Sequence, residues 1–190
     1  IAIILAICYL DDNMLIFQRL IESRIKDNLF KNRAILIFGP RQAGKTTLSK
    51  KILAEFGADG EYFNCELLSV RKYFEVGNPD LLKELIKEKK IVVFDEAQTI
   101  QDIGAILKVF IDTYPNIQII ATGSSSFDLA NKINEPLTGR SFEFTLYPLS
   151  VSEIKQTNPT IKMAELFEYM TLGTYPAVVS AETSLGKKEV

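Results

Sequence analysis

The chain has 190 residues, of which 47% are hydrophobic and 24% charged, and this composition is typical of a globular domain rather than of a disordered or fibrous protein. Its formal net charge of −2 offers no overall basic surface for nucleic acid or anionic membranes, although a local basic patch is not excluded. Histidine is absent and only two cysteines are present, which excludes histidine-dependent catalysis, zinc ligation and a disulfide framework, so we expect a reducing cytoplasm.

The first part of the chain is expected to be a helical lead-in over residues 1–32. Its opening apolar run, residues 1–10, is too short to span a bilayer and lacks the flanks of a signal peptide. We expect this run to be a buried strand or the start of a helix, and we expect no membrane association. Residues 12–31 then repeat apolar side chains at helical spacing, which predicts an amphipathic helix.

Short apolar runs then alternate with helical patterns. We predict strands at residues 34–38, 61–63, 91–94, 117–121 and 142–146. Helices are predicted at residues 45–55, 67–74, 79–88, 103–114 and 163–172. This alternation predicts an α/β fold with a doubly wound, mostly parallel sheet. Residues 33–150 would form its core, and residues 151–190 a C-terminal helical extension that begins a further region.

Residues 39–46 read Gly-Pro-Arg-Gln-Ala-Gly-Lys-Thr and satisfy the phosphate-loop pattern G-x-x-x-x-G-K-[ST] in full. The pattern follows a predicted strand and opens a predicted helix, so that backbone N–H groups and the helix dipole can hold phosphate oxygens. The nucleotide, expected to be ATP with Mg²⁺, should contact the whole stretch, which comprises Gly39, Pro40, Arg41, Gln42, Ala43, Gly44, Lys45, Thr46 and Thr47.

Three side chains of this loop have separate expected roles. Lys45 should reach the β and γ phosphates, and the Thr46 hydroxyl should ligate Mg²⁺. Thr47 is the next hydroxyl and is less suited to be the ligand. Arg41 either lies over the nucleotide or faces solvent, and the sequence does not decide between the two.

Asp95 and Glu96 directly follow the predicted strand at residues 91–94, at the sheet edge that also carries the loop. Asp95 is expected to hold the Mg²⁺ shell through water. Glu96 is expected to orient and polarise the water that attacks the γ-phosphorus, a task that a histidine-free chain must give to such a group. Two solvated acids that merely end a strand are the alternative.

The turn after the next predicted strand and an arginine farther along are further candidates. A polar side chain at Ser124, which we favour over Thr122, can touch the γ-phosphate or the attacking water, although serine-rich turns also cap helices. Arg140 can supply positive charge to the transition state within its own chain or to a neighbouring subunit. A surface arginine before a strand is the alternative reading of Arg140.

These motifs follow one another as in a known family, and they stand at residues 39–48, 94–98 (Phe-Asp-Glu-Ala-Gln), 122–125, 137–140 (Leu-Thr-Gly-Arg), 146–150 with Glu153, and 173–176 (Gly-Thr-Tyr-Pro). The chain resembles the archaeal and bacterial predicted ATPases of AAA type over approximately residues 15–180. The resemblance implies a P-loop NTPase of the additional-strand, catalytic-glutamate type, in which a sensor strand lies between the two Walker strands. It also implies a nuclease-like second domain, which we expect to be missing or barely begun at Val190.

The leading hypothesis is a magnesium-dependent ATPase that acts as a motor or switch, with a homo-oligomer and a nucleic-acid or protein client among its expected partners. A nucleotide-gated interaction module with little turnover is the first alternative, and a small-molecule kinase is the second. A GTPase is disfavoured because residues 131–134, Asn-Lys-Ile-Asn, lack the aspartate of Asn-Lys-x-Asp and do not follow a predicted strand.

Overall fold

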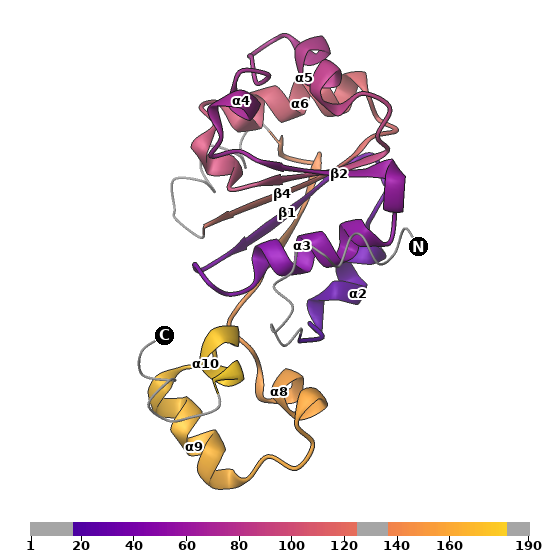
Figure 1. Ribbon diagram of the computed structural model, residues 1–190. Coiled ribbons are helices and arrows are strands. Elements are labelled where there is room, and N and C mark those ends of the chain that lie inside the picture. Colours follow the sequence, from indigo (N-terminus) through magenta and orange to yellow (C-terminus); the bar gives the residue numbers. More distant parts are fainter. Residues whose placement is uncertain (1–16, 125–136, 182–190) are drawn as a thin grey trace.

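The computed structural model of the chain describes residues 17–124 and 137–181 (Figure 1). The expectations for the opening run at residues 1–10 and for the segment at residues 131–134 therefore lie outside the described residues. Within the described ranges, no helix combines the length and the apolar character that crossing a bilayer requires.

The core of the fold is a single sheet of five strands, arranged in the order β2-β3-β4-β1-β5. Every pairing in this sheet is parallel. The predicted doubly wound α/β fold is confirmed, and β4 lies between β1 and β3, as the additional-strand type requires. The strands are β1 (Ala34–Gly39), β2 (Gly60–Asn64), β3 (Ile91–Asp95), β4 (Gln118–Ser124) and β5 (Ser141–Thr145).

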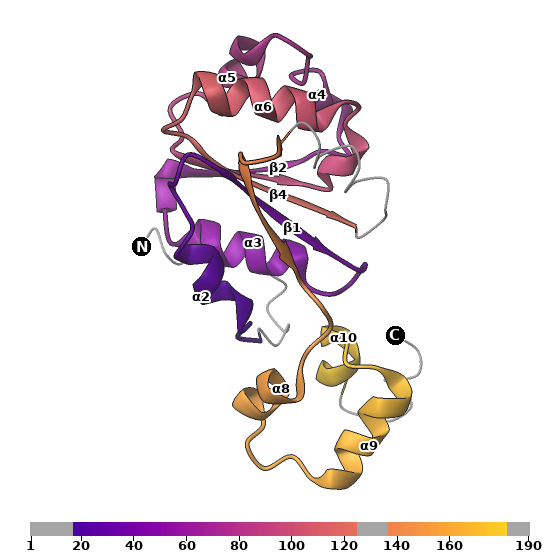
Figure 2. The same ribbon diagram turned by 180° about the vertical axis from the view of Figure 1, so that it is seen from behind.

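Helices cover both faces of this sheet (Figures 1 and 2). One face carries α2 (Ile21–Lys26) and α3 (Lys45–Ala54), and the other carries α4 (Leu68–Arg71), α5 (Pro79–Ile86) and α6 (Ile103–Thr113). Short 3₁₀ turns lie at η1 (Gly57–Asp59) and η2 (Ala97–Thr99). Because successive strand residues point to opposite faces, Ile91 and Val93 pack toward α3, while Val92 and Phe94 pack toward α6.

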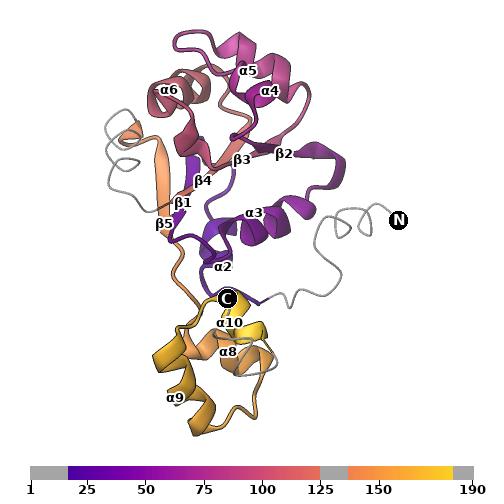
Figure 3. The same ribbon diagram turned by 60° about the vertical axis from the view of Figure 1, so that its left-hand side comes forward.

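Three further helices, α8 (Val151–Thr157), α9 (Met163–Leu172) and α10 (Pro176–Ser180), form a helical unit beyond the end of β5 (Figure 3). A capping box at Ser150 and Glu153 begins α8. The unit has its own small apolar cluster, in which Phe17 from the N-terminal segment packs with Leu149 and Ile154. The N-terminal segment and the C-terminal extension are therefore packed together, although they are far apart in the sequence.

The helix predicted over residues 12–31 is wrong in its extent within the described residues. Only Ile21–Lys26 is helical there, residues 17–20 precede the helix, and residues 27–30 form turns. Phe17 packs against the helical unit and the N–H of Leu20 donates to Glu153, so tertiary contacts hold this segment in a non-helical path. The helical spacing of the apolar residues does not reveal these tertiary contacts.

Candidate functional site

The loop between β1 and α3 is shaped by two glycines. A Cβ atom on Gly39 would lie 2.2 Å from the backbone oxygen of Leu146, so only glycine allows β1 to pass so close to the chain that follows β5. Gly44 has φ 95°, in the left-handed region that glycine adopts without strain, and it is the N-cap of α3. Since no side chain caps this helix and its first turn contains no acidic residue, its first N–H groups and the positive end of its dipole are available to an anion.

Lys45 lies inside the loop, with only 5% of its surface exposed. Its Nζ donates to the carbonyl oxygens of Gly39 and Pro40, each at 2.9 Å. Burial lowers the pKa of Lys45, and the nearby carboxylates of Glu96 and Asp95 act in the opposite direction. The ammonium group is therefore held at the centre of the loop, where a phosphate would lie.

Asp95 is the polar centre of the site and is 4% exposed. Its Oδ2 accepts hydrogen bonds from the Thr46 hydroxyl at 2.8 Å and from the Tyr62 hydroxyl at 2.6 Å. Its Oδ1 accepts from the hydroxyl of Thr122. A carboxylate and a hydroxyl in contact at the end of the loop are the oxygen ligands that Mg²⁺ prefers, so Thr46 and Asp95 fit the predicted metal role.

Glu96 follows Asp95 in a left-handed conformation, with φ 53°, which is uncommon for a residue other than glycine. Its N–H donates to the Thr122 hydroxyl at 3.2 Å, and its carboxylate accepts from the side-chain amide of Gln98. A strained backbone conformation held by such contacts is typical of functional sites. Glu96 thus lies at the same edge of the sheet as the loop, as the sequence predicts.

The strand after β3 contributes two hydroxyl residues with different positions. Thr122 binds both Asp95 and the N–H of Glu96, so its hydroxyl organises the acidic pair. Ser124, the residue favoured from the sequence, ends β4 directly beside Gly39 in the strand register. Both residues are therefore at the site, and Ser124 is the one next to the beginning of the loop.

Arg140 is not brought to the loop of its own chain. Its carbonyl oxygen accepts from the N–H of Ala34, the first residue of β1, whereas the loop follows the last residue of that strand. A strand that rises about 3.3 Å per residue separates the two ends of β1 by roughly 17 Å. The Nε of Arg140 is ion-paired with Asp112 at 2.8 Å, so the geometry does not fit action within the same chain.

The remaining loop residues and two unpredicted residues complete the site. Arg41 and Gln42 are exposed to solvent. Sequence reasoning missed Tyr62 and Gln98, which hold the carboxylates of Asp95 and Glu96. Tyr62 is 33 positions from Asp95 in the chain, and a tyrosine in a half-buried strand carries no signal of such a partner.

The parallel sheet with β4 between β1 and β3, the glycine-shaped loop and the buried Lys45 define a P-loop NTPase fold. Residues 31–155 match the family model described as AAA domain, and the chain belongs to this family. The resemblance to AAA-type ATPases is therefore confirmed.

Known proteins similar to this chain extend well beyond it. The uncharacterized proteins Mb2031c of Mycobacterium bovis and Rv2008c of Mycobacterium tuberculosis are each 31% identical over 149 residues. The match covers 74% of this chain but only 31% of each relative, so the chain spans less than a third of their length. The solved structure of the ORC1 protein of Aeropyrum pernix in complex with DNA superposes with a TM-score of 0.54 at 16% identity. The match covers 82% of this chain and 52% of the ORC1 chain, and it shows a shared fold.

Proposed function

We propose that the chain binds Mg·ATP in the loop at residues 39–46 and hydrolyses it. The observation that carries this proposal is the meeting of a buried lysine, the Thr46–Asp95 hydrogen bond and Glu96 at one edge of the sheet. In this assignment the loop N–H groups and Lys45 bind the β and γ phosphates. Thr46 and Asp95 hold the Mg²⁺, which would neutralise charge on the phosphate oxygens.

Glu96 is the proposed general base. It would accept a proton from a water whose oxygen bonds to the γ-phosphorus, while the bond from that phosphorus to the bridging β–γ oxygen breaks and releases ADP. The hydrogen bond from Gln98 supports this role because it restricts the carboxylate. Ser124 would add a hydroxyl near the γ-phosphate from the end of β4.

Two variants separate hydrolysis from binding. Glu96→Gln keeps the shape of the side chain and removes the base, so phosphate release should fall by about 10²–10⁴-fold while ATP affinity stays within a few-fold. Lys45→Ala should lose affinity, because a charge-assisted contact contributes about 1.5–3 kcal/mol. The measurements are phosphate release from ATP and from GTP, for which we expect a preference for ATP, and calorimetric titration of each folded variant.

The results also discriminate between the alternatives. Unchanged turnover in Glu96→Gln would leave a nucleotide-gated interaction module, and unchanged ATP binding in folded Lys45→Ala would refute the phosphate-loop assignment. Phosphate transfer to a small acceptor without phosphate release would indicate a kinase.

We further propose that hydrolysis drives a motor or switch and that Arg140 acts across a subunit interface. Its position at the opposite end of β1 from the loop supports action on a neighbouring copy rather than within one chain. The client would be a nucleic acid or a protein. We propose that it is bound by the region that the relatives have beyond the part matched by this chain. We place the activity in a reducing cytoplasm, since Cys65 is a buried free thiol.

A further inference from the structure

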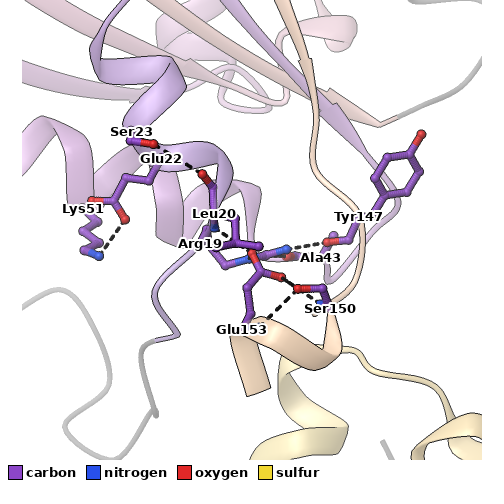
Figure 4. Close-up of polar contacts among 9 residues, drawn as sticks. All are labelled: Arg19, Leu20, Glu22, Ser23, Ala43, Lys51, Tyr147, Ser150 and Glu153. Atoms are coloured by element: carbon purple, nitrogen blue, oxygen red, sulfur yellow. Dashed lines mark hydrogen bonds and ion pairs between the residues drawn. The ribbon is translucent and has the colours of Figure 1, made fainter. Parts of the chain in front are cut away.

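Three distant segments meet behind the phosphate loop at one buried ion pair (Figure 4). Arg19 comes from the segment before α2, and Glu153 comes from the first turn of α8 in the helical unit. Their side chains are 7% and 6% exposed, and the Arg19 Nε lies 3.0 Å from the Glu153 Oε1. None of the motifs that define the nucleotide site includes Arg19.

The guanidinium of Arg19 bridges the loop and the helical unit. Its Nη1 donates to the carbonyl oxygen of Ala43 in the phosphate loop at 2.7 Å. Its Nη2 donates to the carbonyl oxygen of Tyr147, which lies in the connection from β5 to α8, at 2.5 Å. The fixed planar fork of an arginine can satisfy three acceptors in different directions, which the single nitrogen of a lysine cannot do in the same geometry.

Glu153 holds Arg19 in this position and is itself fully engaged. Its Oε1 also accepts from the N–H of Leu20 at 2.9 Å. Its Oε2 accepts from the N–H and the hydroxyl of Ser150 at 2.8 and 3.0 Å. Burial acts to raise the pKa of Glu153, but the hydrogen bonds from Ser150, Leu20 and Arg19 outweigh it and lower the pKa.

The contact with Ala43 determines the direction of a donor inside the loop. In a trans peptide the carbonyl oxygen of one residue and the N–H of the next point in opposite directions. Arg19 holds the Ala43 oxygen, so the Gly44 N–H of the same peptide points away from Arg19. The start of α10 also approaches this point, since a Cβ on Gly44 would lie 3.5 Å from Arg19 Nη1 and 3.8 Å from Pro176 Cγ.

We propose that Arg19 and Glu153 are positioning residues that hold the phosphate loop in its binding geometry and link that geometry to the docking of the helical unit. The inference rests on the proposed function, because it assigns a role in nucleotide binding. Linkage is reciprocal, so a nucleotide that favours this loop geometry must also favour the contacts of the helical unit that depend on it.

The test compares two buried glutamates. Glu153→Gln places an amide where the carboxylate must accept from both Arg19 and Ser150, so Arg19 loses its charged partner. Glu22→Gln is the matched control, because Glu22 is similarly buried and is paired with Lys26 and Lys51. Its carboxylate points to Lys51, away from Ala43 of the loop (Figure 4). Arg19→Lys keeps the positive charge, but a single ammonium group cannot contact Glu153, Ala43 and Tyr147 in the same geometry.

Calorimetry with a non-hydrolysable ATP analogue and Mg²⁺ measures the effect on each folded variant. We expect the Kd to rise roughly tenfold in Glu153→Gln and in Arg19→Lys, as for the loss of one charge-assisted contact, and to change less than about twofold in Glu22→Gln. An unchanged Kd in Glu153→Gln and Arg19→Lys, or an equal rise in Glu22→Gln, would overturn the positioning role while leaving ATP binding by the wild type intact. A wild type that binds no analogue would overturn the proposed function, and this inference with it.

Hydrogen exchange on the wild type supplies a measurement that needs no variant. The analogue should slow exchange at the N–H groups of Leu20 and Ser150, which donate to Glu153, together with those of the loop. Protection of the loop amides with unchanged exchange at Leu20 and Ser150 would contradict the link to the helical unit.

Discussion

Tyr62→Phe removes one oxygen atom and tests whether Asp95 is held by its neighbours. The Tyr62 hydroxyl donates to Asp95 Oδ2 at 2.6 Å, and burial together with this hydrogen bond raises the pKa of Tyr62. In the variant, Asp95 keeps the hydrogen bonds from Thr46 and Thr122. The ring of Tyr62 also lies 4.3 Å from the Lys50 Nζ, a contact that phenylalanine preserves.

The expected loss of stability follows from the chemistry of this contact. A hydrogen bond to a charged group contributes about 1.5–3 kcal/mol. Since Tyr62 is only half-buried, solvent can replace part of the contact, and we expect a loss of about 1–2 kcal/mol. For a chain of this size such a loss lowers the Tm by about 3–6 °C. A freer Asp95 should also raise the Mg²⁺ concentration needed for half-maximal hydrolysis on the order of tenfold.

Thermal unfolding and a Mg²⁺ titration of ATP hydrolysis measure the two effects. Tyr114→Phe is the matched control, because Tyr114 is also partly buried and also donates to an aspartate, Asp80, but this hydrogen bond is exposed to solvent and lies on the far side of the sheet. The control should change neither property appreciably. A Tm within 1 °C of the wild type and an unchanged Mg²⁺ requirement for Tyr62→Phe would refute the view that Tyr62 orients Asp95.

Three further predictions concern other parts of the fold. Gly39→Ala should destabilise the chain by about 1–3 kcal/mol in urea denaturation, because its Cβ would meet the Leu146 backbone oxygen at 2.2 Å, and an unchanged midpoint would contradict that contact. The lowered pKa of Glu153 means that its stabilisation is present above its unfolded pKa, near 4.5, and is lost as the pH falls through the folded pKa. The Tm difference between the wild type and Glu153→Gln should therefore shrink in acid. A constant difference from pH 7 to pH 3 would show that the ionised Glu153 carboxylate does not stabilise the fold. If Arg140 acts between subunits, mixing Arg140→Ala protein with Glu96→Gln protein should restore part of the hydrolysis that each lacks, and wild-type turnover in Arg140→Ala alone would exclude that role.

The sequence by itself determined the parts of the protein that depend on local pattern. Apolar runs such as residues 91–94 are buried on both faces, so the strands could be predicted to within one residue at each end, except that β4 continues three residues beyond its predicted end at residue 121. The loop at residues 39–46 could be recognised because its chemistry needs glycines, a lysine and a hydroxyl at fixed spacing. Asp95 and Glu96 could be assigned to the same edge because parallel strands end together.

Only the tertiary structure decided which distant side chains meet. Tyr62 reaches Asp95 from a neighbouring strand, and Arg19 reaches Glu153 across 134 positions of sequence. Arg140 lies away from the loop of its own chain because the start of β5 pairs with the start of β1. Such contacts depend on strand order and on the packing of the helical unit, and hydrophobic periodicity reports which face of an element is buried but not which partner covers it.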